Sequence, residues 1–322
     1  MTNQNEFNYG GQAVIEGVMM RGSKALAVAV RNPAGEIVVH SEPLNTRIYG
    51  GRLARMPFLR GLTLLWDALG LGIKSLMFSA EVALEEESDD EEPAQVFEGP
   101  AQWGTVLFSL TFSVLLFFVL PTFLARQVVI WLGAGESQLA ENFIEGVIRL
   151  GLLVGYVWGI GFIPDIRRLY GYHGAEHKTI NAYEAQAELI PATVAEYPLE
   201  HPRCGTAFLL SVVVLSILIY SLLPPLSLLV RILSRIVLLP VVAGVAYEFI
   251  RYTAAHQDNS FIRLITKPNL ALQRLTTQEP DEDMLAVAIA AFKQVMAFEQ
   301  GQLELVETAQ IIKSPLGEAA QL

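Results

Sequence analysis

Two histidines and a glutamate in one short run carry the clearest chemical signal in the chain. The run is His173-x-x-Glu176-His177, which has the inverzincin pattern. On a helix, histidines four residues apart lie one turn apart on the same face, so both imidazoles can reach one Zn²⁺ at about 2.0–2.1 Å. Glu176 lies beside them and could take a proton from a metal-bound water. The spacing predicts a divalent metal site, most naturally for zinc, with two histidine ligands and Glu176 as general base.

The spacing does not dictate a third ligand. His201 and Cys204 are the leading candidates, because a His-x-x-Cys pair just before a membrane span can fold back over the preceding loop. Glu184 shares the face of the second histidine, but on a straight helix it lies about 10 Å farther along the axis. His256 and Arg203 are further candidates for the site, although Arg203 also fits the role of an interfacial anchor.

The same residues also have a purely structural interpretation. Histidines near a membrane surface are often hydrogen-bonded parts of the fold, and Glu176 could then pair with Lys178, Arg203 or Arg167. Cys204 could be a small buried apolar residue, since Gly205 follows it at the start of a span.

The composition indicates a membrane protein. Of 322 residues, 52% are hydrophobic and 17% are charged, whereas soluble chains carry about 25% charged residues. The net charge of −11 comes mainly from nine acidic residues between 81 and 98, and without them −2 remains. No basic footprint for a nucleic acid is present. The single cysteine excludes an internal disulfide and fits a reducing compartment or a membrane.

Four apolar segments are expected to cross the bilayer, which needs about 20 residues for a helix. They are 103–123, 144–163, 207–223 and one within 226–250 that contains Pro240 and Gly244. Arg231 and Arg235 lie at the start of the fourth segment. Of the two ways to place them, along the interface or facing the bundle interior, we expect the interface, because Pro224-Pro225 breaks the chain just before them.

The basic residues predict the orientation. Four crossings place residues 1–100, 165–205 and 251–322 on one side, and these contain 18 of the 22 Lys and Arg residues. The positive-inside rule then makes that side cytoplasmic, with both termini. No signal peptide is visible in the first twelve residues.

The expected domains outside the spans are small. Residues 8–50 read as a β module, with strands 26–30 and 37–39 around the turn Asn32-Pro33-Ala34-Gly35. Residues 57–80 read as an amphipathic helix that does not span, because Arg60, Asp67 and Lys74 recur every seven residues. The full set is the β module (8–50), the amphipathic helix (57–80), an acidic solvated linker (81–100), a membrane domain (101–250) with a cytoplasmic loop (165–205), and a cytoplasmic C-terminal helix and tail (251–322).

The C-terminal helix has a clear start signal. Leu275 to Asp283 supplies a threonine near the cap position, a proline and several acids. Leu285, Ile289, Phe292 and Met296 then recur at helical spacing, so one face is expected to pack.

Several of these motifs together resemble the YqhQ family of bacterial membrane proteins. The resemblance covers residues from about 10 to 295, and its motifs are 10–22 (GGQAVIEGVMMRG), 172–178, 201–205, Tyr247-Glu248 and 275–280 (LTTQEP). It implies a multi-pass inner-membrane protein, and the family's general label is that of a metal-dependent enzyme. Where a Pro-Gly would be expected before the last motif, this chain has Pro268-Asn269, and asparagine also tolerates the left-handed turn conformation.

Three functions follow as hypotheses. The first is a four-span helical inner-membrane protein whose cytoplasmic face holds a divalent metal, most naturally zinc, for hydrolysis of an amide or ester in a substrate from the membrane or the cytoplasm. The second is a non-enzymatic membrane scaffold or biogenesis factor, in which the polar cluster pins the loops together. The third is a transporter, suggested by Arg149, Arg231 and Arg235 in or near the spans.

Overall fold

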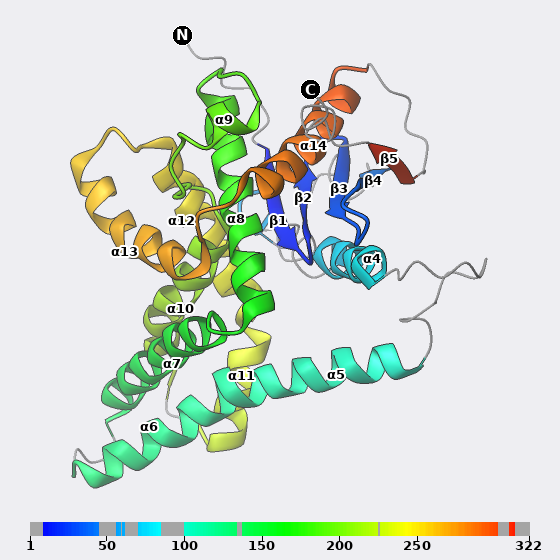
Figure 1. The fold of residues 1–322 in the computed structure, drawn as a ribbon. Helices are drawn as coiled ribbons and strands as arrows, with labels where there is room; N and C mark the ends of the chain where they lie inside the picture. The colour runs from blue at the N-terminus through cyan, green and yellow to red at the C-terminus, as the bar shows by residue number, and fades with distance from the viewer. Residues whose placement is uncertain are drawn as a thin grey trace.

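The chain is mostly helical and carries one small antiparallel sheet (Figure 1). The computed structural model describes residues 9–44, 56–58, 60–61, 70–84, 100–133, 137–224, 226–301 and 309–312. Four strands follow one another as a meander: β1 (Gly10–Val14), β2 (Gly17–Arg21), β3 (Ala25–Arg31) and β4 (Ile37–Pro43). The predicted hairpin is confirmed, and Gly35 at its turn has φ +85°, which glycine adopts without strain.

A fifth strand comes from the other end of the sequence. β5 (Ala309–Ile312) pairs antiparallel with β4, and Ile312 lies opposite Ile37. The sequence did not indicate this strand, because four residues in a tail carry too short a pattern to separate a strand from coil. The N-terminal and C-terminal regions therefore meet in one sheet.

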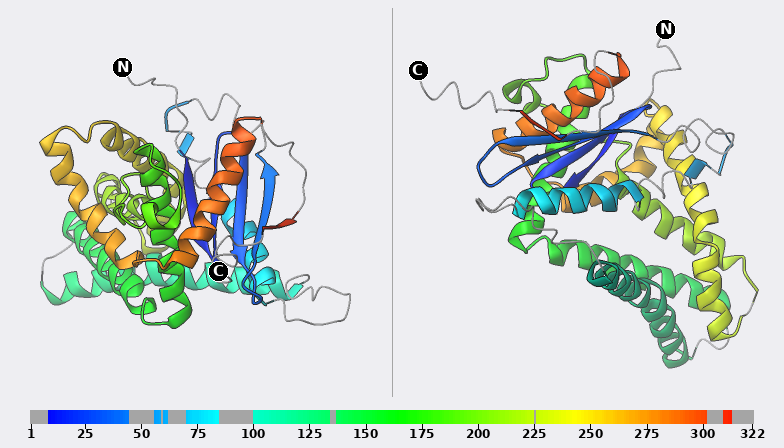
Figure 2. Two further views of the ribbon diagram at one scale, coloured as in Figure 1. Left: turned by 45° about the horizontal axis from the view of Figure 1, so that its top comes forward. Right: turned by 90° about the vertical axis from the view of Figure 1, so that its right-hand side faces the viewer.

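Both faces of the sheet are covered by helices (Figure 2). Alternate residues point to opposite faces. Met19 and Val28 pack toward α4 (Gly72–Leu84), together with Val82 of that helix. Met20 and Ala27 pack toward α14 (Glu282–Glu299) and α8 (Pro164–Glu184). The acids of the predicted start signal are confirmed, because α14 has Glu282 and Asp283 in its first turn and the Asp281 side chain accepts a hydrogen bond from the Met284 N–H. The expected threonine cap is wrong, since Thr276 ends α13, and Pro280 precedes the cap residue. The sheet and the helices α4, α8 and α14 together form a layered unit, which we call the head. Packing within the head fixes the position of α8.

The segment 57–80, predicted as an amphipathic helix, packs in its described parts against the sheet through α4 and against Gly244 through Gly61. α4 runs to Leu84, into the stretch expected as an acidic linker, while residues 62–69 and 85–99 lie outside the described part of the chain. Lys74 pairs with Glu42 of β4, and Arg60 pairs with Glu248. Two of the three charges in the predicted stripe thus bind protein partners; Asp67 falls outside the described residues.

Among the described residues, two helices are long and apolar enough to cross a membrane. One, Gly104–Trp131, joins α5 (Pro100–Val114), the π-helical turn η2 (Leu115–Val119) and α6 (Leu120–Trp131). The other is α7 (Gln138–Ile160). α11 (Leu228–Val237) and α12 (Leu239–Ala255) meet at 43° and become a third candidate if the bent pair counts as one span. α10 (Gly205–Ser221) is apolar but shorter. These helices support membrane association. They give two candidate crossings, or three with the bent pair, where the sequence predicted four.

The expectation that Arg231 and Arg235 lie at the interface is wrong. Arg235 is 1% exposed and its Nε lies 3.1 Å from Oε1 of Glu145, while Arg231 pairs with Glu141. The Arg235 guanidinium also stacks 4.1 Å from the ring centre of Tyr220. The two arginines turn inward because α7 carries buried carboxylates that need cationic partners in a low-dielectric bundle.

The C-terminal region contains one more helix than the sequence indicated. α13 (Ser260–Thr276) precedes α14 and contains Pro268, which is exposed. Proline inside a helix removes a backbone hydrogen bond, so a segment that contains Pro268 gives a poor sequence signal for a helix. A short helix, α9 (Pro191–Val194), lies in the segment that follows α8.

Candidate metal centre

The helix α8 places the two histidines of the predicted motif one turn apart. It begins with Pro164 in its first turn and Asp165 near its positive end, both favoured there. Gly174 lies between the histidines although glycine costs a helix about 1 kcal/mol relative to alanine. The reason is a close approach: a Cβ at Gly174 would lie 2.1 Å from the carbonyl oxygen of Gln278. The glycine lets the segment after α13 run directly against α8.

Both imidazole rings are oriented by backbone carbonyls. Nδ1 of His173 lies 2.8 Å from the Thr276 oxygen, and Nδ1 of His177 lies 2.5 Å from the Leu199 oxygen. A carbonyl oxygen only accepts hydrogen bonds, so each Nδ1 carries a proton. In the neutral form of each ring, Nε2 is then the unprotonated nitrogen and lies on the other side of the ring. This is how second-shell hydrogen bonds orient metal-binding histidines.

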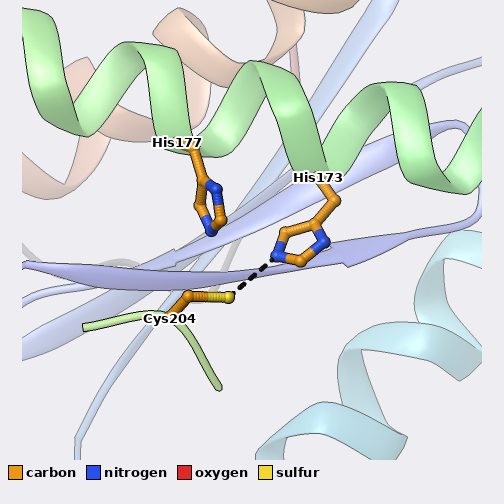
Figure 3. Close-up of side chains that lie close together, drawn as sticks. All are labelled: His173, His177 and Cys204. Carbon is orange, nitrogen blue, oxygen red and sulfur yellow. Dashed lines mark hydrogen bonds between the residues drawn. The ribbon is translucent and has the colours of Figure 1, made fainter. Parts of the chain in front are cut away.

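Those Nε2 atoms converge on Cys204 (Figure 3). The Nε2 atom of His173 lies 3.2 Å from Sγ of Cys204, and one ligand atom from each of His173, His177 and Cys204 lies within 4.8 Å of the others. The buried Nε2 of His177 has no hydrogen bond of normal geometry to the described residues, although the Cys204 side chain lies close enough to interact with this ring. Imidazole and thiolate are both ligands of zinc, so these three donors could bind one divalent ion and leave a fourth position open, as in catalytic zinc sites.

Glu176 lies at the side of this group with its carboxylate turned toward β1. The Gly11 N–H donates to the carboxylate, while Oε2 has no hydrogen-bond partner among the described residues. A Cβ at Gly11 would lie 2.9 Å from the Glu176 Cδ, so glycine is needed there. Burial raises the pKa of Glu176, and His173 and His201 oppose this increase only partly. A buried carboxylate with a raised pKa is suited to accepting a proton near neutral pH.

His201 lies beside the three donors but outside their group. Its ring is 5.8 Å from that of His177, and the Gln273 side chain holds its backbone N–H and C=O, each at 2.9 Å. Burial lowers the pKa of His201 to about 4. The ring is therefore neutral at physiological pH, so its 3.7 Å approach to Glu184 is no ion pair. Its Nε2 also lacks a hydrogen bond to the described residues.

The remaining sequence candidates lie away from the donor group. Glu184 pairs with Arg203 at a partly exposed position. His256 is exposed, and its ring stacks on Tyr252 at 4.3 Å. Glu184 and His256 therefore contribute no donor atom to the cluster that the structure describes.

The cations expected to pair with Glu176 in the structural interpretation bind elsewhere. Lys178 contacts Glu279 at 2.6 Å, Arg203 contacts Glu184, and Arg167 donates to Gln278 at 3.1 Å. Glu176 thus keeps an unpaired oxygen beside the histidines.

Four contributors were not identified from the sequence. They are the Gly11 N–H, the Leu199 and Thr276 carbonyls and the Gln273 side chain. Gly11 and Thr276 belong to motifs that carry the family resemblance, and the structure brings Gly11 to Glu176 and Thr276 to His173. That co-occurrence was the signal available in the sequence.

Comparison with known proteins agrees with the resemblance. The family described as "Protein of unknown function (DUF1385)" matches residues 56–298. The chain is also 33% identical over 300 residues to the "Uncharacterized protein YqhQ" of Bacillus subtilis (strain 168), which covers 90% of this chain and 93% of that protein. No solved structure matches the chain. The expected similarity to the YqhQ family is confirmed.

Proposed function

The chain belongs to the DUF1385 family of proteins of unknown function, and we propose that it is a membrane-associated metalloprotein that binds Zn²⁺ through His173, His177 and Cys204. One observation carries the proposal. Both histidines use Nδ1 to donate to a backbone carbonyl, which leaves two Nε2 lone pairs facing one sulfur atom. Imidazole nitrogen and thiolate sulfur both suit Zn²⁺, and three protein ligands leave the open fourth position of a catalytic zinc site.

The proposed activity is hydrolysis of an amide or ester. A bound Zn²⁺ supplies Lewis-acid activation of a water molecule or carbonyl group. Glu176 would accept the proton of the attacking water, and its burial and raised pKa support this role. Gly11 fixes one end of the carboxylate, so the other oxygen stays available for the proton.

A scaffold is the second candidate, and burial favours it. His177 is fully buried and Cys204 is 5% exposed. The donors join α8, the segment before α10 and, through Thr276, the end of α13. A metal there would cross-link three parts of the chain, as structural zinc sites do.

We further propose an even number of crossings, with the head and both termini in the cytoplasm. β5 pairs with β4, and α8 and α14 pack on the same sheet, which supports having all of these segments on one side of the membrane. The α5–α6 helix and α7 would form one crossing pair. If the bent α11–α12 pair crosses, α10 must cross too, giving the expected four. The distribution of Lys and Arg supports the cytoplasmic side for the head.

The test is metal content. Purified wild type should hold near-stoichiometric zinc, and His177→Ala should lose it. His256→Ala is the matched control, because it removes an exposed histidine outside the cluster. Zinc-free wild type after growth and purification with zinc, or equal zinc in His177→Ala, contradicts the proposed site.

Glu176→Gln then separates the two candidate functions. The amide keeps the size of the side chain but cannot accept the proton. Retained zinc with loss of the cellular phenotype complemented by wild type supports catalysis, whereas retained zinc with full complementation supports the scaffold.

A further inference from the structure

Helix α13 exposes two adjacent strips of different chemistry. At 100° per residue, Arg263, Lys267 and Arg274 fall within an arc of about 40°. Leu264 and Phe261 fall in the next part of the exposed surface, and they are 59% and 66% exposed. An apolar strip beside a basic strip is the pattern of a helix that lies in the interface of a membrane.

The charge around this helix is positive. Between residues 251 and 274 the sequence has four basic residues and one acid, Asp258. Arg274 is neutralised by Glu200 at 2.8 Å, whereas Arg263 and Lys267 are exposed. The exposed strip therefore attracts anionic groups such as the headgroups of an anionic leaflet.

The position of α13 fits a bilayer surface. It follows α12 after four residues, and Tyr252 near the end of α12 is 57% exposed, a residue type enriched at membrane interfaces. In Figures 1 and 2, α13 lies at the outer edge of the helical part, away from the sheet. Its Asn269 side chain reaches Ser211, in the first half of the apolar helix α10, at 3.4 Å.

The buried side of α13 leads directly to the candidate metal centre. Gln273 clamps the backbone of His201 through two hydrogen bonds, and the Thr276 carbonyl accepts from Nδ1 of His173. A shift of this helix would move the acceptor that orients one proposed ligand.

We propose that α13 lies on anionic lipid headgroups through Arg263 and Lys267, with Phe261 and Leu264 inserted beside them, and that this contact holds Thr276 where His173 binds zinc. The lipid surface then regulates the metal affinity of the head. The proposed contact of α13 with lipid (docking) rests only on insertion of the chain in a membrane. The proposed effect of that contact on zinc affinity (coupling) rests on the proposed metal site.

Docking is tested by photo-crosslinking in nanodiscs. The benzophenone side chain of p-benzoylphenylalanine is placed at Leu264, and at Lys293 on α14 as the control. A lipid adduct at 264, stronger in discs rich in phosphatidylglycerol than in pure phosphatidylcholine and absent at 293, supports docking. No lipid adduct at 264, or equal adducts at both positions, overturns the proposal.

Coupling is tested by zinc affinity, measured by competition with a chelator in the same two disc types. We expect affinity about fivefold higher or more in phosphatidylglycerol, the lower end of allosteric coupling. Arg263→Gln/Lys267→Gln should abolish the difference, and Lys24→Gln/Lys293→Gln, which removes the same charge from the head, should keep it.

The two proposals fail in different ways. Equal zinc affinity in both lipids overturns the coupling while leaving the metal site intact. Zinc binding in neither disc type overturns the metal site, and the crosslink at 264 still decides docking.

Discussion

His173 Nε2 lies 3.2 Å from Sγ of Cys204, although 31 positions separate the two residues. α8 supplies the histidine, and the residue just before α10 supplies the thiol. The contact joins the polar head to the start of an apolar helix. Any ion bound here would therefore tie α8 of the head to the start of the apolar helix α10.

Replacing the sulfur tests its role as a ligand. Cys204→Ser keeps nearly the same volume at a site that is 5% exposed, so the fold should persist. A serine hydroxyl is a much weaker zinc ligand than a thiolate, because it does not ionise near neutral pH. We expect zinc affinity to fall at least about tenfold, measured by chelator competition. Unchanged affinity would mean that the sulfur does not coordinate the metal.

Gly174 should not tolerate a side chain. In Gly174→Ala the new Cβ would meet the Gln278 carbonyl at 2.1 Å, so the segment that carries Thr276 must move away. We expect a loss of about 1–3 kcal/mol in stability together with weaker zinc binding. Gly155→Ala on α7 is the control, because nothing lies within 4 Å of its Cβ position. Equal melting temperatures for the two variants would contradict the close approach.

The buried ion pairs of the helical bundle should be essential for stability. Arg235→Ala leaves Glu145, which is 1% exposed, with fewer cationic contacts. We expect a destabilisation of about 3 kcal/mol, measured as thermal unfolding in detergent. Arg126→Ala removes an exposed arginine from α6 and should have little effect. A fully stable Arg235→Ala variant that has lost its cellular function would instead favour the transport hypothesis.

One ion pair of the head should make stability depend on pH. Glu16 accepts two hydrogen bonds of 2.6 Å from Arg168, and these hold the pKa of Glu16 below its usual value. A lowered folded-state pKa stabilises the protein above about pH 4.5, and this contribution disappears as the pH falls through the folded-state pKa. Glu16→Gln should therefore cost about 1 kcal/mol at pH 7, since the pair is partly exposed.

The denaturant midpoints of wild type and Glu16→Gln should converge as the pH falls below 4. Glu188→Gln, which removes the same charge from an exposed position, is the control. A gap between wild type and Glu16→Gln that stays constant from pH 7 to pH 3 would show that the charge does not contribute.

The sequence alone determined the features that depend on local spacing. Helical periodicity placed His173 and His177 on one face, hydropathy identified the apolar helices, and Gly35 marked the hairpin. Each of these features depends on backbone geometry over a few residues, so the types and spacing of neighbouring residues are enough to predict it.

Only the tertiary structure decided which distant residues meet. It selected Cys204 over His201 for the donor group, brought Thr276 to His173, turned Arg235 inward to Glu145, and added β5 to the sheet. Each contact requires a long loop to close, and the free energy of that closure depends on everything that packs around it. Spacing along the chain therefore could not predict the partners, whereas burial of charged and polar groups, which must find one another away from water, determined them.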